Sequence, residues 1–279
     1  MPRRTEMEAM GPTQTNLSSE KLLSLMEVMS GLSEPARLQD LSRELQMNSS
    51  TVLRFLAALQ RKGYAARDID TGRYYLTFKL CGMAQSISSN MSIRNISLPF
   101  LRSVSRIFGE SANLSIEYDM SVMYVEVVNG PSKTLVSTQR IGNIAPMHCT
   151  GVGKLLLQNY TPNQMEQMIV VKGLARYTAD TLTTPQELMS AVEEARVRGY
   201  AFDNEECETG VRCIAAPVRD YTGQVVAGIS VSGPTARMTD EHIFGNLPYL
   251  LETGDEVSHR LGWKEKGQGI PAEKSIFNS

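Results

Sequence analysis

Four polar residues, Ser49, Ser50, Thr51 and Arg54, are the side chains best suited to recognise another molecule in the first third of the chain. They begin a segment in which apolar residues repeat at i, i+3, i+4 and i+7 from Val52 to Leu59, the period of a half-buried helix. A recognition helix presents short hydroxyls and a guanidinium near its N-terminus to the edges of DNA bases. These four residues are therefore predicted to contact DNA.

The elements around this segment complete a known arrangement. Residues 38–45 form a short amphipathic helix, residues 46–48 a tight turn, and Asn48 suits the N-cap of the next helix. Residues 64–66 and 73–78 flank a turn at residues 70–72, which predicts a hairpin. Helix, turn, helix and hairpin together predict a winged helix-turn-helix, although two amphipathic helices alone also fit any small helical bundle.

The local charge favours the DNA-binding alternative. Residues 49–79 contain six basic and two acidic residues, a net charge of +4, whereas the whole chain has a net charge of −2. Contacts with phosphates need such a local excess. Arg67 and Arg73 of the hairpin are predicted to contact the DNA backbone or the minor groove.

The second half of the chain changes its periodicity several times. Residues 112–118, 121–128, 134–139, 211–219 and 225–232 alternate as strands do, and residues 98–108 have a helical period. Thr161-Pro162 and Thr184-Pro185 mark two helix starts, and residues 238–262 form a closing helix interrupted or restarted at Pro248. The predicted fold class is α+β, with helices packed on an antiparallel sheet.

A length of 279 residues suits two domains. We expect a disordered arm (1–15), a winged helix-turn-helix domain (16–78), a linker helix (79–90), a second domain (91–264) and a tail (265–279). The four cysteines form no Cys-x-x-Cys pair, and no apolar run reaches the length of a membrane span. The sequence thus predicts a cytoplasmic protein with reduced thiols that does not interact with membranes.

The glycine cluster Gly151-Val152-Gly153-Lys154 invites comparison with a phosphate-binding loop. A Walker loop needs Gly at His148 and Ser or Thr at Leu155, so that interpretation fails. A Gly-rich helix start still points free backbone N–H groups outward, which suits one carboxylate.

Two later strands could complete a pocket for that carboxylate. Val211 and Cys213 share one strand face, and Ser230 and Ser232 share a face of another. Two hydroxyls on one face indicate a polar cavity, unless both face solvent on a one-sided sheet. Asp203 could accept a hydrogen bond from a ligand hydroxyl, whereas Glu205, Glu206 and Glu208 fit a solvated acidic turn.

Catalysis and metal binding have little support in the sequence. Cys149, Cys207 and Cys213 with His148 could bind a metal in principle, but their spacing matches no zinc pattern. We expect no metal and no cofactor. No set of nucleophile, base and orienting group is present beyond Asp203 and Cys213. An enzyme acting on a small acid and a structural DNA-bridging protein are the alternatives to a regulator.

From about Leu17 to Trp263 the chain resembles the IclR family of bacterial transcriptional regulators. The resemblance is carried by SSTVLRFLAALQRKGY at residues 49–64, MHCTGVGKLLL at 147–157 and RGYAFDNEECETGVRCIAAPVRDYTGQVVAGISVSGP at 198–234. It implies a winged helix-turn-helix, a linker helix and a GAF-like effector-binding domain. It also implies a homodimer or homotetramer on palindromic double-stranded operator DNA.

The resemblance further implies a response to a small organic acid, an aromatic acid or a sugar acid. Repression is the commoner outcome in the family, and activation is the alternative. The family pocket carries over to the backbone of Gly151 and Val152, the side chains of Asp203, Cys213, Ser230 and Ser232, and apolar lining from Val211. Residues 134–137 vary within the family and determine the ligand. Gln46 and Ser49 depart from the Gly and Lys common in the family.

Overall fold

The computed structural model describes residues 17–83, 92–131 and 140–264. The expected arm (1–15), tail (265–279), end of the linker helix (84–90) and strand over 134–139 lie outside the described residues. Contacts divide the chain into two units, Met1–Asn90 and Met91–Ser279. Each unit is described by itself.

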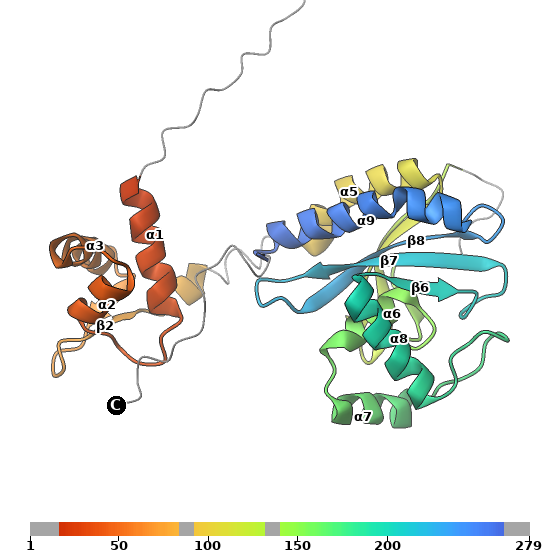
Figure 1. Cartoon of the computed structure of the whole chain (residues 1–279), viewed down its shortest axis with the longest axis horizontal. Helices are drawn as coiled ribbons and strands as arrows, with labels where there is room; N and C mark the ends of the chain where they lie inside the picture. Colours follow the sequence, from red (N-terminus) through yellow and green to blue (C-terminus); the bar gives the residue numbers. More distant parts are fainter. Residues whose placement is uncertain (1–16, 84–91, 132–139, 265–279) are drawn as a thin grey trace, which may run out of the picture. The chain divides into compact units, whose positions relative to one another are not determined.

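Among its described residues, the first unit begins with three helices that are followed by a hairpin (Figure 1). They are α1 (Leu17–Ser30), α2 (Leu38–Glu44), α3 (Ser49–Arg61), β1 (Ala65–Arg67) and β2 (Tyr74–Leu76). The strands pair antiparallel, with Ala65 opposite Leu76, and residues 79–83 begin a further helix. The apolar stripe expected on α3 is buried against Leu25 of α1 and Leu41 of α2. The winged helix-turn-helix prediction is confirmed.

The turn between α2 and α3 contains a strained residue. Gln46 has a φ of 51°, in the left-handed region that favours glycine. A residue with a Cβ in this conformation costs about 1 kcal/mol. Asn48 occupies the predicted N-cap of α3, but its side chain makes no capping hydrogen bond.

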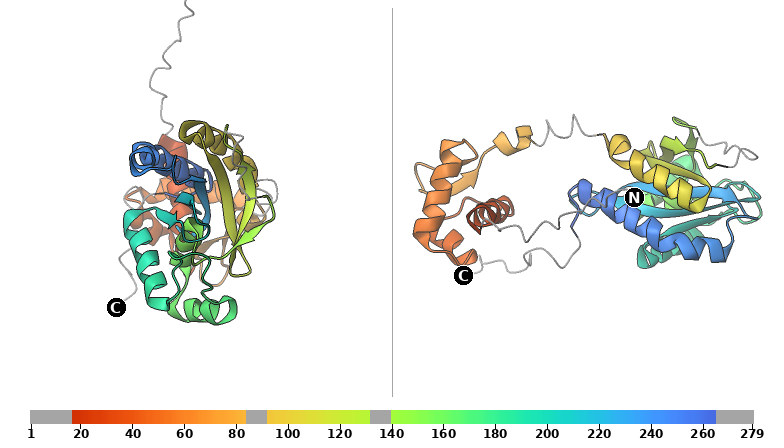
Figure 2. Two further views of the ribbon diagram at one scale, coloured as in Figure 1. Left: turned by 90° about the vertical axis from the view of Figure 1, so that its right-hand side faces the viewer. Right: turned by 90° about the horizontal axis from the view of Figure 1, so that it is seen from above.

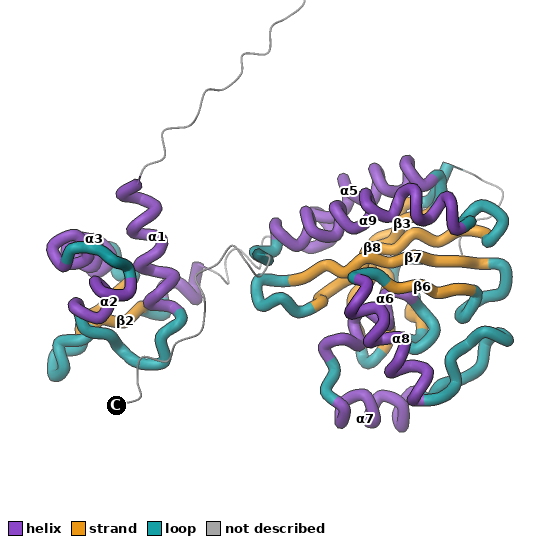
Figure 3. Tube along the Cα trace, in the orientation of Figure 1, coloured by secondary structure: helices purple, strands orange, loops and turns teal. Residues whose placement is uncertain are grey.

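The second unit is a six-stranded antiparallel sheet between two layers of helices (Figure 3). Its strand order is β5-β4-β3-β8-β7-β6. The strands are β3 (Ser111–Tyr118), β4 (Ser121–Val128), β5 (Ile144–Ala145), β6 (Ala201–Asn204), β7 (Val211–Arg219) and β8 (Val225–Pro234). The helices are α5 (Ile93–Phe108), α6 (Gly151–Leu156), the 3-10 turn η1 (Leu157–Asn159), α7 (Pro162–Lys172), α8 (Pro185–Arg198) and α9 (Asp240–Arg260). The predicted α+β class is therefore confirmed.

The two faces of the sheet differ in chemistry. Helices α5 and α9 cover one face, where Leu114, Ile214 and Ile229 form an apolar core (Figure 2). Helices α6, α7 and α8 lie on the other side (Figure 1). There Leu155 and Leu188 belong to a second apolar core, which leaves part of the sheet face to polar side chains.

Three elements differ from the sequence prediction. Helix α5 begins at Ile93 instead of residue 98, and α9 continues through Pro248 without interruption. Helix α9 buries Leu250 and Val257 against the sheet core, which offsets the hydrogen bond lost at proline. Strand β6 was not among the predicted strands; it forms because Ala201–Asn204 pair with β7, directly before the expected acidic turn.

The two predicted Thr-Pro helix starts both form capping boxes. The Oγ1 atom of Thr184 accepts from the Glu187 backbone N–H at 3.3 Å, and Glu187 Oε2 accepts from the Thr184 N–H at 3.1 Å. Replacing Thr184→Ala should lower the free energy of unfolding by about 1 kcal/mol. Denaturant titration measures this loss. Thr184→Ser, which retains the hydroxyl, should cost much less; equal losses would contradict the capping role.

Candidate functional site

Helix α6 approaches the sheet more closely than side chains normally allow. A Cβ on Gly151 would lie 3.0 Å from the Ala201 carbonyl oxygen, and one on Gly153 would lie 2.1 Å from that of Met147. The Val152 side chain fills the space beside Gly228, where a Cβ would meet it at 2.8 Å. Gly151 and Gly228 therefore allow close packing of α6 on β6, β7 and β8, and Gly153 allows α6 to pass close to the backbone of Met147 in the segment before it.

The start of α6 keeps two backbone donors available. Thr150 Oγ1 accepts from the Gly153 N–H at 3.2 Å. Within the described ranges, the N–H groups of Gly151 and Val152 have no hydrogen-bond acceptor. These are the two backbone groups that the sequence assigned to a ligand carboxylate.

The sheet face beneath α6 brings the predicted side chains together. Strand pairing places Asp203 opposite Cys213, Cys213 opposite Ser232, and Ala215 opposite Ser230. Paired residues of antiparallel strands point to the same face. Ser230 and Ser232 are each 5% exposed, so the alternative in which they face solvent is wrong. Val211 lies half-buried at the start of the same strand face.

Hydrogen bonds connect this face across three strands. The Cys213 thiol donates to Ser232 Oγ at 3.0 Å, and Asn113 Nδ2 donates to the same oxygen at 3.3 Å. Burial raises the pKa of the Cys213 thiol well above its ordinary value. The thiol is therefore a neutral hydrogen-bond donor at physiological pH and a poor nucleophile.

The sequence prediction missed two residues on this face. Asn113 and Ser115 of β3 are fully buried, and they face the same side as Ser230 because Asn113 pairs with it. The signal was present: Ser111, Asn113 and Ser115 alternate with apolar neighbours along one strand. Tyr124 of β4 pairs with Ser115, and burial raises the pKa of its hydroxyl.

Asp203 is the ionisable group at the centre of this cluster. It is 4% exposed, and its Oδ1 accepts from the backbone N–H groups of Glu206 at 2.9 Å and Cys207 at 3.2 Å. Burial raises the pKa of Asp203 to about 7, and the two N–H groups oppose that rise. The carboxyl group can therefore accept or donate a hydrogen bond near neutral pH.

Two further thiols lie beside this carboxylate. The Cys149 thiol donates to Cys207, which raises the pKa of Cys149 and lowers that of Cys207. The neighbouring His148 Nε2 lies 3.0 Å from the Ala175 carbonyl oxygen. Among the residues that the structure describes, no three His, Cys, Asp or Glu side chains form a group that could hold a metal ion.

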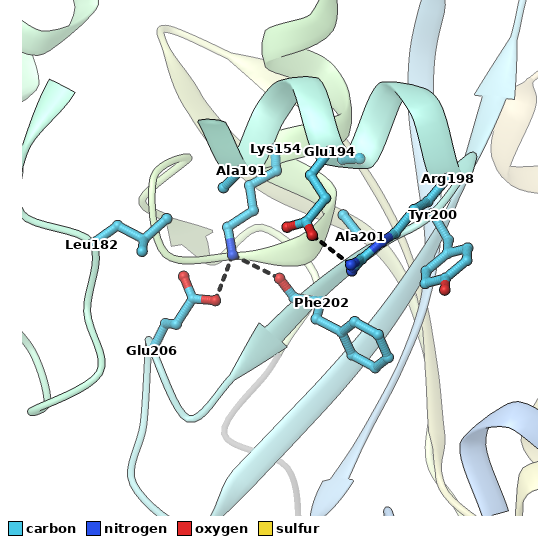
Figure 4. A pocket seen from close by; sticks show the side chains of 10 residues that line it. Lys154, Leu182, Ala191, Glu194, Arg198, Tyr200, Ala201, Phe202 and Glu206 are labelled. Carbon is cyan, nitrogen blue, oxygen red and sulfur yellow. Dashed lines mark hydrogen bonds and ion pairs between the residues drawn. The ribbon is translucent and has the colours of Figure 1, made fainter. Parts of the chain in front are cut away.

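A cavity of about 190 Å³ lies between α6, α8 and β6 (Figure 4). It is lined by Lys154, Leu182, Ala191, Glu194, Ala195, Arg198, Tyr200, Ala201, Phe202 and Glu206. Lys154 Nζ donates to Glu206 Oε1 at 2.5 Å and to the Phe202 carbonyl oxygen at 2.8 Å. None of the residues assigned to the effector from the sequence lines this cavity.

The interpretation of Glu206 as part of a solvated turn is wrong. The Glu206 and Lys154 side chains are 9% and 6% exposed, respectively, and form a buried ion pair. The partners are far apart in the sequence, so local composition could not reveal the pairing.

In the first unit, the predicted DNA-contacting residues divide into two groups. Ser49, Ser50 and Arg54 are exposed at the start of α3, and Thr51 is half-buried. Arg67 and Arg73, the arginines of the β1–β2 hairpin, make contacts within the protein. Arg67 Nε donates to the Gly72 carbonyl oxygen at 3.0 Å.

Arg73 is attached to the segment before α2. Its Nη1 lies 3.5 Å from the Pro35 carbonyl oxygen and 3.8 Å from Glu34 Oε2. Arg54 has a different setting, since its guanidinium lies over the ring of Phe55, 5.7 Å from the ring centre. In the described part of the chain, no helix is both long and apolar enough to cross a membrane.

Two family models match the chain. The IclR helix-turn-helix domain matches residues 18–68, and the bacterial transcriptional regulator IclR C-terminal model matches residues 85–259. The HTH-type transcriptional regulator BhcR of Paracoccus denitrificans is 34% identical over 237 residues, 85% of this chain and 83% of that protein.

Two further similarities agree with these matches. The HTH-type transcriptional repressor AllR of Escherichia coli K12 is 26% identical over 88% of this chain and 90% of that protein. The crystal structure of the Thermotoga maritima IclR has a TM-score of 0.58 at 27% identity, covering 88% of this chain and 99% of that chain.

The raised pKa of Asp203 predicts a pH dependence of stability. The folded state binds the proton of the Asp203 carboxyl group more tightly than the unfolded chain does. The stability that this proton contributes therefore falls as pH rises from about 4 to about 7. Asp203→Asn should remove that fall. We therefore expect the variant to gain stability relative to the wild type across this range in denaturant titrations. Parallel curves for the two proteins would contradict the assignment.

The buried ion pair predicts a large mutational cost. Glu206→Gln leaves the Lys154 ammonium buried without a countercharge, and should lower the free energy of unfolding by roughly 3 to 5 kcal/mol. Glu194 pairs with Arg198 at the surface and provides a matched control. Glu194→Gln should cost less than about 1 kcal/mol. Similar losses at both positions would show that burial of the pair is unimportant.

Proposed function

The chain belongs to the IclR family of bacterial transcriptional regulators, and on that premise we propose that it represses a catabolic operon until a small organic acid binds. A regulator of this family binds DNA through the helix-turn-helix and a small molecule through the effector domain. The effector would be a hydroxy, keto, aromatic or sugar acid. The name of the relative AllR, a repressor, supports repression over activation.

The observation that carries the effector site is the buried polar face beneath α6. Buried polar side chains need hydrogen-bonding partners, and apolar residues would pack at the same positions with a lower desolvation cost. The proposed effector contacts are the N–H groups of Gly151 and Val152 and the side chains of Asp203, Cys213, Ser230 and Ser232, with Val211 as apolar lining. A protonated Asp203 could donate to the ligand carboxylate, and an ionised one could accept from its hydroxyl.

The proposed DNA contacts lie in the first unit. Ser49, Ser50, Thr51 and Arg54 would enter the major groove. Arg67 and Arg73 would contact the backbone or the minor groove, for which their present contacts with Gly72 and Pro35 must be exchanged or shared. The proposed domain limits remain 16–78 for the winged helix-turn-helix domain, 79–90 for the linker helix and 91–264 for the effector domain.

The proposed mechanism is a shift between two populations of a homodimer or homotetramer. The effector would favour one arrangement of the linker helices. The spacing between the winged helix-turn-helix domains of two subunits would then match, or no longer match, the spacing of the operator half-sites. Because its target is DNA, the protein would act in the cytoplasm. The enzymatic alternative is disfavoured by the neutral, hydrogen-bonded thiol of Cys213.

The effector site can be tested by thermal unfolding against panels of hydroxy, keto, aromatic and sugar acids. A ligand at a hundred times its Kd should add about 2.7 kcal/mol to the stability of the folded state. The shift should disappear in Asp203→Ala and Ser230→Ala but persist in Ser190→Ala, which removes an exposed hydroxyl from α8. A shift that survives in both pocket variants would place the effector elsewhere.

The DNA contact of Arg54 can be tested by comparing two substitutions. Arg54→Ala should weaken specific binding by roughly 1 to 3 kcal/mol, the value of a bidentate base contact. Arg54→Lys should retain the dependence of binding on salt but lose specificity, because an ammonium lacks the planar fork of donors. Fluorescence anisotropy with operator and random duplexes measures both quantities. Unchanged operator affinity in Arg54→Ala would refute the assignment.

A further inference from the structure

The exposed face of α3 carries an apolar side chain among its polar ones. Leu53 is 46% exposed, whereas Leu56 and Leu59 of the same helix are 0% and 4% exposed. Ala57, one turn further, is also exposed. Packing within the first unit therefore does not account for a leucine at position 53.

The neighbours of Leu53 show which surface this residue belongs to. Ser50, Leu53, Arg54 and Ala57 follow the spacing i, i+3, i+4 and i+7, so they form one continuous patch on α3. The apolar strip within this patch is only one leucine and one alanine wide. Gln60, exposed at the next turn, continues the polar border. A strip of this width suits contact with single methyl groups and not a protein core.

We infer that Leu53 and Ala57 read the 5-methyl groups of thymines in the operator. The C5 methyl of thymine is an apolar group that the base edges present in the major groove, and apolar side chains contact it there. Charge complementarity favours DNA as the occupant, since residues 49–79 have a net charge of +4. This inference rests on the proposed binding of α3 in the major groove, and it adds an apolar specificity contact to the hydrogen bonds proposed above.

Deoxyuridine tests the inference, because it differs from thymidine only by that methyl group. The full-length protein first selects duplexes from a random library, and each thymine of the selected duplex is then replaced singly. At one or two positions in each half-site, we expect a loss of affinity of roughly threefold to fivefold, the effect of burying one methyl group. No loss at any thymine would overturn the inference.

A double-mutant comparison assigns the methyl contact to the helix. In Leu53→Ala, the replacement at the thymine read by Leu53 should no longer change affinity, whereas the response at a thymine read by Ala57 should persist. A thermal unfolding curve verifies that the variant is folded. Leu32→Ala removes another exposed leucine, 39% exposed in the loop before α2, and should retain the wild-type response to deoxyuridine. An unchanged response in Leu53→Ala would refute the role of Leu53. Failure to select any duplex would instead refute the proposed DNA binding itself.

Discussion

The effector domain depends on the close approach of α6 to the sheet. A Cβ at Gly151 would crowd the Ala201 carbonyl oxygen at 3.0 Å, and the Val152 side chain fills the space that a Cβ at Gly228 would need. Asn113, Asp203, Ser230 and Ser232 on the sheet face beneath α6 are at most 5% exposed, so each polar group there needs a partner in the protein or a ligand. A side chain at Gly151 or Gly228 would push α6 away from the sheet and open the proposed pocket.

Burial beneath α6 sets the electrostatic environment of the groups around it. Lys154 and Glu206 form a buried ion pair, and Lys154 also donates to the Phe202 carbonyl oxygen. Asp203 has no such countercharge in contact and therefore titrates near neutral pH. An organic acid entering beside Asp203 would meet a group able to supply the proton that two adjacent carboxyl groups need to share.

Much of this arrangement was predictable from the sequence where local rules apply. The capping residues Thr161 and Thr184 and the strand parity of Ser230 and Ser232 depend on spacing alone, and the structure agrees with them. The burial of Glu206 was missed because its partner lies 52 residues away. The uninterrupted α9 was missed as well, since tertiary packing outweighs the local effect of a proline.

In the proposed mechanism, the effector and the operator each stabilise a different arrangement of the same dimer or tetramer. The most direct test is to measure the Kd of an identified effector, by isothermal titration, with the free protein and with the protein saturated by operator duplex. Linkage requires that operator weaken effector binding by the same factor by which effector weakens operator binding. We predict a reciprocal factor of roughly 5 to 150. Equal effector affinity in the presence and absence of operator would contradict the account.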